Sequence, residues 1–152
     1  QLFGIAAAMS RDTYPATAMT ADECLTLSWP TQLWHKFATD YQGFSTENYK
    51  MLGERLGEVN NRVVEMATQH VEQRVANTLL RLINQNGKPV ENGIAIDFPI
   101  TRQNLSDMTG TTLHTVSRLL RAWKKKGWVA STRKRVVVTD AHKLVVLSNA
   151  GI

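Results

Sequence analysis

The longest regular pattern of apolar positions runs through residues 44–68. Side chains there recur at alternating spacings of four and three residues, which is a heptad seam sustained for three repeats. The seam consists of Ser45, Tyr49, Leu52, Leu56, Val59, Val63 and Met66. Charged side chains of lysine, arginine and glutamate lie between the seam positions and suit water or interhelical ion pairs. The pattern predicts a helix that pairs with a second copy. The alternative is an amphipathic helix packed on its own domain, which needs a wider apolar stripe.

The first 30 residues show short apolar runs cut by turn residues. Residues 16–20 and 24–28 are predicted to be strands, because apolar and polar side chains alternate there. Two or three strands are too few to bury their faces or to pair their edges. This segment is therefore expected to be the tail of a larger sheet. A short helix is predicted over residues 31–41, where aromatic side chains recur at helical spacing.

Two more helical patterns follow the seam. Residues 71–86 form one predicted helix, which stops at Asn86 and Gly87 as helix ends prefer. Residues 88–97 contain proline and glycine and are predicted to be a connector with one strand.

Residues 100–128 carry the most specific pattern. A short amphipathic helix, with Thr101 or Ser106 as its cap, ends at Gly110, and a second one follows. The second helix is predicted to turn Val116, Leu119, Leu120 and Trp123 inward, and His114, Thr115, Ser117, Arg118 and Arg121 outward. Two short helices joined at a glycine, the second basic on its outer face, predict a helix-turn-helix whose second helix enters the major groove.

A wing is predicted directly after these helices. Residues 128–130 and Val136 to Val138 are expected to pair as a hairpin whose tip, with Arg133, Lys134 and Arg135, is well placed to touch the phosphate backbone. The lysine run at 124–126 also has a simpler explanation, because cations complement the carboxyl end of a helix.

Charge points to the same part of the chain. Residues 93–152 hold 10 basic and 3 acidic side chains, whereas residues 1–92 hold 8 basic and 10 acidic ones. A basic module is typical of a domain that binds nucleic acid, although a solvated basic surface is the alternative. The single Cys24 forms no disulfide within this chain and indicates a reducing, cytoplasmic setting. No apolar run approaches the roughly 20 residues of a membrane span, and no arrangement of nucleophiles, paired carboxylates or metal ligands suggests an enzyme.

The runs ITRQNLSDMTG (residues 100–110) and TTLHTVSRLL (residues 111–120) resemble the winged helix-turn-helix of the Crp/Fnr transcription regulators. The resemblance extends over the whole chain: residues 71–82 are similar to the helix after the dimerisation helix, and residues 3–8 and 14–18 to late strands of the effector-binding jelly roll. Members of this family begin well before this point, so the chain is expected to lack the first strands of the roll.

The resemblance assigns roles by position. The residues that it places on the DNA backbone are Thr101, Arg102, Gln103, Thr112 and Thr115. His114, Ser117 and Arg118 would face the bases, and Arg118 suits the two acceptors of guanine. Well-known members carry glutamate where this chain has His114, which leaves the base pair read there open.

The effector half departs from the cyclic-nucleotide binders of the family. Ile5 and, approximately, Tyr14 stand where those members place the glutamate and the arginine that hold the ribose phosphate. The resemblance therefore argues against cyclic AMP as the ligand. It is greatest to the nitric-oxide-responsive, denitrification-linked branch, which makes haem a candidate cofactor, with His35 and His70 as candidate ligands or as exposed side chains without that role.

The sequence thus predicts an α+β fold in three parts. They are the C-terminal part of an effector-binding jelly roll (1–43), a dimerisation helix (44–68) and a winged helix-turn-helix domain (69–152). The predicted function is an effector-controlled, homodimeric transcription regulator that binds double-stranded DNA and RNA polymerase, with no membrane partner. The alternative is a coiled-coil adaptor or protein-binding module without DNA specificity.

Overall fold

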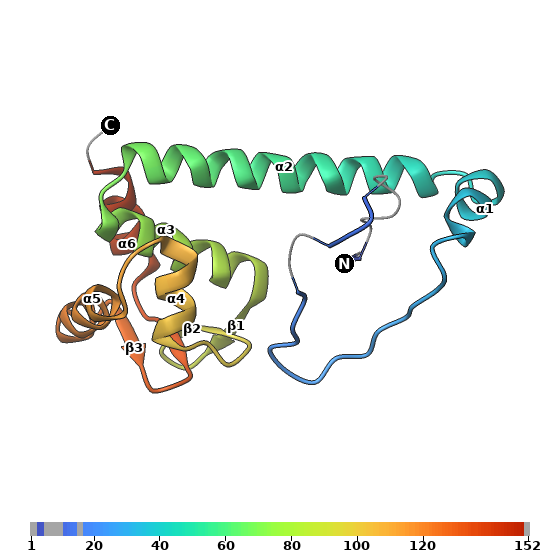
Figure 1. Cartoon of the computed structure of the whole chain (residues 1–152). Helices are drawn as coiled ribbons and strands as arrows, with labels where there is room; N and C mark the ends of the chain where they lie inside the picture. The colour runs from blue at the N-terminus through green and yellow to red at the C-terminus, as the bar shows by residue number, and fades with distance from the viewer. Residues whose placement is uncertain (1–2, 5–10, 15–16, 151–152) are drawn as a thin grey trace. The chain divides into compact units, whose positions relative to one another are not determined.

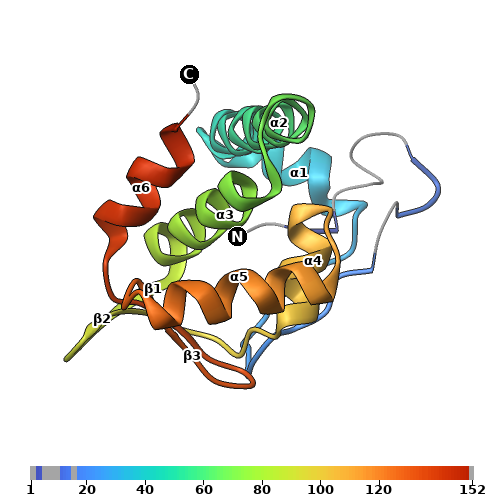
Figure 2. The same ribbon diagram turned by 90° about the vertical axis from the view of Figure 1, so that its left-hand side faces the viewer.

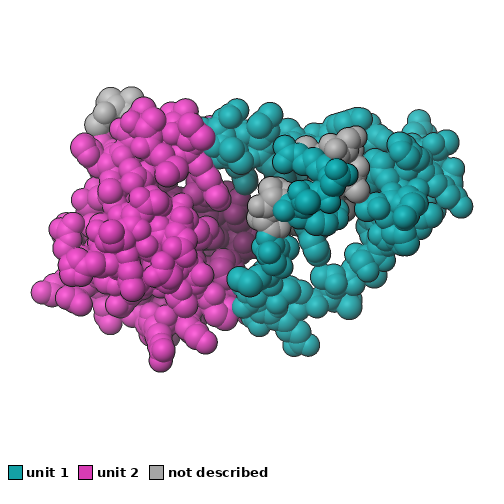
Figure 3. Space-filling model, viewed as in Figure 1, with its two compact units in different colours: residues 1–60 teal, residues 61–152 magenta. Residues whose placement is uncertain are grey.

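The structure is a computed structural model that describes residues 3–4, 11–14 and 17–150. The chain divides into two compact units, residues 1–60 and residues 61–152, coloured separately in Figure 3. The division falls inside the long helix α2 (Phe44–Thr68), labelled in Figure 1. The predicted three-part division of the chain stays a prediction.

An aromatic cluster organises the first unit. Helix α1 (Leu33–Asp40) confirms the helix predicted over residues 31–41. The ring of Phe37 lies edge-on to Trp29, Tyr41 and Phe44, with centroid distances of 5.6, 5.9 and 5.8 Å. These contacts join α1 to the start of α2, although no described residue of α1 is fully buried.

The two strands predicted in the first 30 residues are not observed. Residues 17–28 contain no strand and are exposed throughout, so the strand predicted over residues 24–28 is wrong for this chain. Residue 16, where the other predicted strand begins, lies outside the described residues, as does Ile5. A strand is held by hydrogen bonds to a neighbouring strand, and no described residue of this unit supplies one.

Helix α2 confirms the helix predicted over residues 44–68 and leaves its seam largely uncovered. Tyr49, Leu56, Val59 and Val63 keep between 55% and 73% of their accessible surface, and Leu52 is half-buried. No residue of α2 is fully buried within this chain. Packing on the described part of its own chain therefore does not account for the apolar seam.

The second unit combines four shorter helices with a small sheet. Helix α3 (Val71–Asn86) matches the prediction, and α6 (Ala141–Asn149) is an element that the sequence pattern did not indicate. The segment after α3 forms a complete hairpin of β1 (Gly87–Val90) and β2 (Gly93–Ile96), which corrects the prediction of a connector with one strand. The strands were missed because proline and glycine occupy them; Pro89 is tolerated since β1 is the edge strand of the sheet.

The sheet is antiparallel with the strand order β1-β2-β4-β3, in which β3 (Val129–Ser131) and β4 (Val136–Val138) come directly before α6 in the chain. Helix α3 lies between α6 and helix α4 (Arg102–Thr109), and helix α5 (Leu113–Lys125) packs against α4 and β3 (Figure 2). The sheet and these helices enclose one apolar core. Its fully buried members include Val75, Leu79, Leu105, Val116, Leu120, Trp123 and Leu144.

Candidate nucleic-acid interface

Helix α4 begins at a reciprocal cap. The hydroxyl of Thr101 accepts a hydrogen bond from the Asn104 amide nitrogen at 3.1 Å, and the Thr101 amide donates to Asn104 Oδ1 at 2.9 Å. A capping box of this kind satisfies two backbone donors that the first turn of a helix leaves unpaired. Of the two predicted caps, Thr101 is therefore the one used, and its hydroxyl is engaged within the protein.

The turn between α4 and α5 depends on Gly110 and Ser106. Gly110 has a φ of +60°, a left-handed conformation that favours glycine. A Cβ atom at this position would also lie 2.9 Å from the terminal methyl carbon of Met66. The Ser106 hydroxyl donates to the carbonyl of Thr111 at 2.6 Å and closes the turn from the inside. These contacts confirm the predicted break at Gly110 and give Ser106 a role in the turn.

Helix α5 presents the two faces that its sequence predicts. The side chains of Val116, Leu119, Leu120 and Trp123 are at most 7% exposed. His114, Arg118 and Arg121 are exposed, and Thr115 and Ser117 are partly exposed.

Thr112 caps the amino end of α5, because its hydroxyl accepts a hydrogen bond from the Thr115 amide at 3.1 Å. Four of the five outward residues predicted for α5 lie within its first two turns, near this capped amino end.

The predicted wing is present and is joined to the start of α4. Strands β3 and β4 pair from Val129 with Val138 to Ser131 with Val136. Arg133 and Lys134 lie in the exposed tip between the strands. The Lys134 carbonyl accepts a hydrogen bond from the Ile100 amide at 2.9 Å, directly before the α4 cap. The wing tip and the amino end of α4 are thus held side by side.

Two further residues that the resemblance places on the DNA backbone lie in the first turn of α4. Arg102 is half-buried, and its Nε is a buried donor for which the described residues supply no acceptor. Gln103 is exposed, and its amide donates to Asp107 Oδ1 at 2.7 Å. An acceptor brought by a ligand, such as a phosphate oxygen, would satisfy the Arg102 donor.

The lysine run has more than one structural role. Lys124 and Lys125 lie in the last turn of α5, where cations complement the helix dipole. The ammonium of Lys126 lies 4.5 Å from the centroid of the Trp128 ring, a cation–π contact. Complementing the helix dipole therefore accounts for Lys124 and Lys125. Lys126 instead contacts the Trp128 ring.

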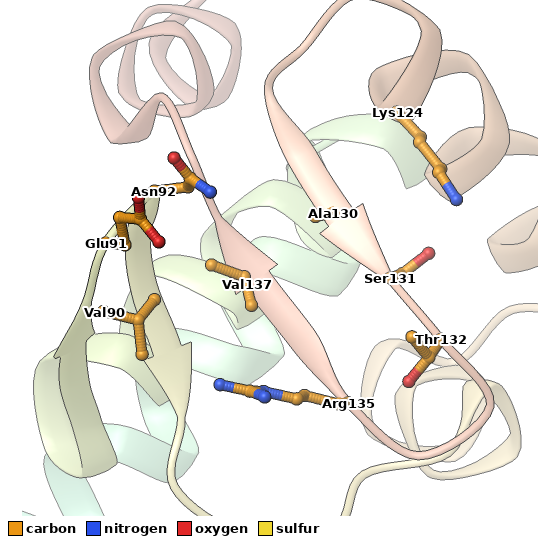
Figure 4. A pocket seen from close by; sticks show the side chains of 9 residues that line it. All are labelled: Val90, Glu91, Asn92, Lys124, Ala130, Ser131, Thr132, Arg135 and Val137. Atoms are coloured by element: carbon orange, nitrogen blue, oxygen red, sulfur yellow. The ribbon is translucent and has the colours of Figure 1, made fainter.

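A hollow of about 340 Å³ lies over the sheet, between the β1–β2 turn and the wing (Figure 4). Charges of both signs line it, with Glu91 at the turn, Arg135 on the wing and Lys124 from α5. None of the ten predicted DNA-binding residues lines it. The hollow therefore adjoins the wing without including Arg133 or Lys134 of its tip.

Helix α3 supplies contacts to both helices of the motif that the sequence did not reveal. The indole nitrogen of the fully buried Trp123 donates to Glu72 Oε1 at 3.2 Å. The guanidinium Nε of Arg74 donates to the carbonyl of Thr109, the last residue of α4, at 3.1 Å. The two residues of each pair are far apart in the sequence, so no local pattern indicates these hydrogen bonds.

The described residues hold no cluster of three or more histidine, cysteine or acidic side chains that would bind a metal ion. His35 and His70 are both exposed. Among the described helices none is long and apolar enough to span a bilayer.

Most of the second unit is similar to a known DNA-binding domain. Residues 73–147 match the Crp-like helix-turn-helix domain. The matched region starts in the first turn of α3 and ends in α6, so the Crp-like domain includes both helices of the motif, the wing and the whole sheet.

Curated relatives of the chain are transcription regulators. The chain is 23% identical over 129 residues to a CRP-like cAMP-activated global transcriptional regulator of Mycobacterium tuberculosis, a match that covers 85% of the chain and 58% of the relative. It is 40% identical over 67 residues to the transcriptional activator protein FnrL of Cereibacter sphaeroides, covering 43% of the chain and 25% of the relative. The chain thus spans little more than half the length of the first of these relatives.

A solved structure shares the fold. A mutant of CooA from Carboxydothermus hydrogenoformans superposes with a TM-score of 0.72 at 24% identity, covering 78% of this chain and 55% of that one. These matches confirm the predicted α+β fold with a winged helix-turn-helix and the similarity to Crp/Fnr regulators. The named relatives are regulators, in agreement with the prediction that this chain is not an enzyme.

Proposed function

We propose that this chain is the dimer-forming and DNA-binding part of a transcription regulator of the Crp/Fnr type. The observation that carries the proposal is the arrangement around α5. Its exposed His114 and Arg118 lie near its capped amino end, and the wing tip lies beside the start of α4. The Crp-like match over residues 73–147 supports this reading.

The roles divide between bases and backbone. Arg118 is exposed on the second turn of α5 and lies one turn after His114, so the two side chains share the face that would enter the groove. A guanidinium donates to two acceptors of one guanine, the commonest specific contact in the major groove. Lys134 in the wing tip and Arg102, with its unpaired Nε, would contact phosphates.

The net charge of the second unit supports DNA as the partner. Residues 93–152 carry 10 basic and 3 acidic side chains, and the wing and α5 supply most of the basic ones. A surface of this charge binds DNA with an affinity that falls steeply as salt is added, because bound phosphates release counterions. An adaptor that binds protein through the same helices would not show this salt-dependent affinity for DNA.

The dimer would form through α2. Its seam residues are uncovered within the described part of the chain, and an apolar stripe kept at heptad spacing is the pattern of a paired helix. Two copies would present two recognition helices to a two-fold symmetric operator, with half-sites about 34 Å apart.

The finer assignments also belong to this proposal. The effector would bind in the part of the protein that precedes α1, and the resemblance to the nitric-oxide-responsive branch favours haem over cyclic AMP. RNA polymerase would be the partner at a promoter, and the cytoplasm the setting in which the chromosome is reached.

The test compares two variants on two DNAs. The operator is first selected by the unaltered chain from a random-sequence duplex library. Arg118→Ala should lower affinity for this operator by about 1 to 3 kcal/mol and relax the preference at one guanine. Lys134→Ala should weaken operator and scrambled DNA alike and reduce the salt slope by about one.

The results for Arg118→Ala also test whether α5 enters the major groove in the proposed orientation. If Arg118→Ala weakened both DNAs equally, the helix would not read bases in this orientation. A chain that selects no sequence from the library, and binds DNA without salt dependence, would favour the adaptor instead.

A further inference from the structure

The junction between α2 and α3 is pinned by side chains of α3. The Arg74 guanidinium Nη1 donates to the carbonyl of Gln69 at 2.8 Å, just beyond the end of α2. The Asn77 amide donates to Gln69 Oε1 at 3.0 Å, and the His70 amide donates to Gln73 Oε1 at 2.8 Å. Both residues of the connection are therefore fixed by the helix that follows them.

Arg74 also reaches the helix-turn-helix. Its Nε donates to the Thr109 carbonyl at 3.1 Å, at the carboxyl end of α4. One guanidinium thus serves carbonyls at the ends of two helices, where backbone acceptors lack intrahelical partners and a positive charge complements the dipole. The planar fork of arginine holds the two donors at a fixed separation and angle, whereas the lysine ammonium sits on a flexible stem and lacks this fixed geometry.

Two other contacts hold the last turns of α2 on the same body. The Glu65 carboxylate lies 3.5 Å from Arg81 of α3, with both side chains 19% exposed. The terminal methyl of Met66 lies so close to Gly110 that a Cβ there would be 2.9 Å away. In agreement with these contacts, the compact unit that holds the helix-turn-helix begins at Asn61, inside α2.

We propose that Arg74 is a positioning residue that fixes the helix-turn-helix to the carboxyl-terminal turns of the dimerisation helix. In the dimer, this connection sets the separation and orientation of the two recognition helices. The inference rests on the proposed function and adds a specific residue to it. Through Arg74, the turn of the motif is tied to the end of α2 across Gln69 and His70.

The test uses the distance between half-sites as its readout. Arg74→Gln removes the forked contact, and Lys143→Gln on the exposed face of α6 removes the same charge as a matched control. Affinity is measured for a duplex with one half-site, for the selected operator, and for operators lengthened or shortened by one base pair between the half-sites.

Arg74→Gln is expected to keep half-site affinity within about twofold and to lower operator affinity about tenfold, because the second half-site is no longer held in register. The penalty for altered spacing should shrink as well. Lys143→Gln should resemble the unaltered chain. Equal losses on half-site and operator, together with a lower unfolding temperature, would mean a purely structural role and would overturn the proposal, as would an unchanged spacing penalty.

A second measurement needs no DNA and separates this inference from the proposed function. Spin labels at Arg62→Cys on α2 and Arg121→Cys on α5, in a Cys24→Ser background, report the distance between the two elements within one chain when labelled protein is diluted into unlabelled protein. Arg74→Gln should broaden this distance distribution, and an unchanged width would overturn the positioning role even if no operator were found.

Should Arg74→Gln fail to fold, Arg74→Lys takes its place in both measurements. It keeps the charge and most of the packing and loses only the fork, so the same pattern is expected. Normal spacing discrimination and a narrow distance distribution in Arg74→Lys would contradict the proposal.

Discussion

Replacing Val63 by glutamate is expected to dissociate the dimer, whereas the same change at Val64 should leave it intact. The two valines are 61% and 58% exposed in the single chain and lie next to each other on α2. Only Val63 belongs to the heptad seam, because successive residues point about 100° apart around a helix. Val64→Glu is therefore a control matched in chemistry, exposure and position.

The magnitude follows from the exposed surface. Burying a whole valine or leucine side chain stabilises by about 1.5 to 3 kcal/mol. With 61% of Val63 still accessible, pairing would supply roughly 1 to 2 kcal/mol in each chain. Both chains of a dimer carry the substitution, so the loss is about 2 to 4 kcal/mol, or about 30- to 1,000-fold in the dissociation constant. Burying the new carboxylate adds to this cost.

Sedimentation equilibrium over a micromolar concentration series measures the dissociation constant of each variant. Circular dichroism shows whether both retain the helicity of the unaltered chain. Adding Leu56→Glu, at a residue that is 63% exposed on the same seam, should push the equilibrium further toward monomer. A dimer that survives Val63→Glu unchanged, or one that Val64→Glu weakens as much, would refute the seam as the interface.

Three further predictions concern the stability of the helix-turn-helix and are checked by chemical denaturation followed by tryptophan fluorescence. Gly110→Ala should destabilise by about 1 kcal/mol or more, since its φ of +60° disfavours a side chain; an unchanged midpoint would argue against this turn. Thr112→Ala should cost about 1 kcal/mol through loss of the α5 cap, whereas Thr112→Ser should cost little. Glu72→Gln, which retains an acceptor for the Trp123 indole, should be milder than Glu72→Leu, which leaves that buried donor unpaired at about 1 to 3 kcal/mol; equal effects would contradict this role.

Local patterns were sufficient for most of the helices. The ends of α3 were predicted correctly, because its apolar period stops at Asn86 and Gly87. The buried face of α5 followed from helical spacing alone, and glycine at position 110 marked the turn. In each case the deciding interactions are between residues a few positions apart, which the sequence displays directly.

The short strands and the last helix were harder to predict. Hairpin β1–β2 contains Pro89 and two glycines, and its strands are defined by pairing with each other and with β4. The alternation in residues 24–28 predicted a strand, yet none forms there in the described chain. A strand exists only when a partner strand is present, and the residues of one segment do not show whether it is.

The sequence by itself determined which faces are apolar, which residues are charged and where the helices before α6 lie. It therefore indicated the recognition helix, the wing and the heptad seam. Only the tertiary structure decided how these parts are joined. Arg74 bonds to Thr109, 35 positions away, and Glu72 to Trp123, 51 positions away. Such contacts depend on how α3 packs between its neighbours, because the packing of a whole core sets the distance between residues that no local spacing relates.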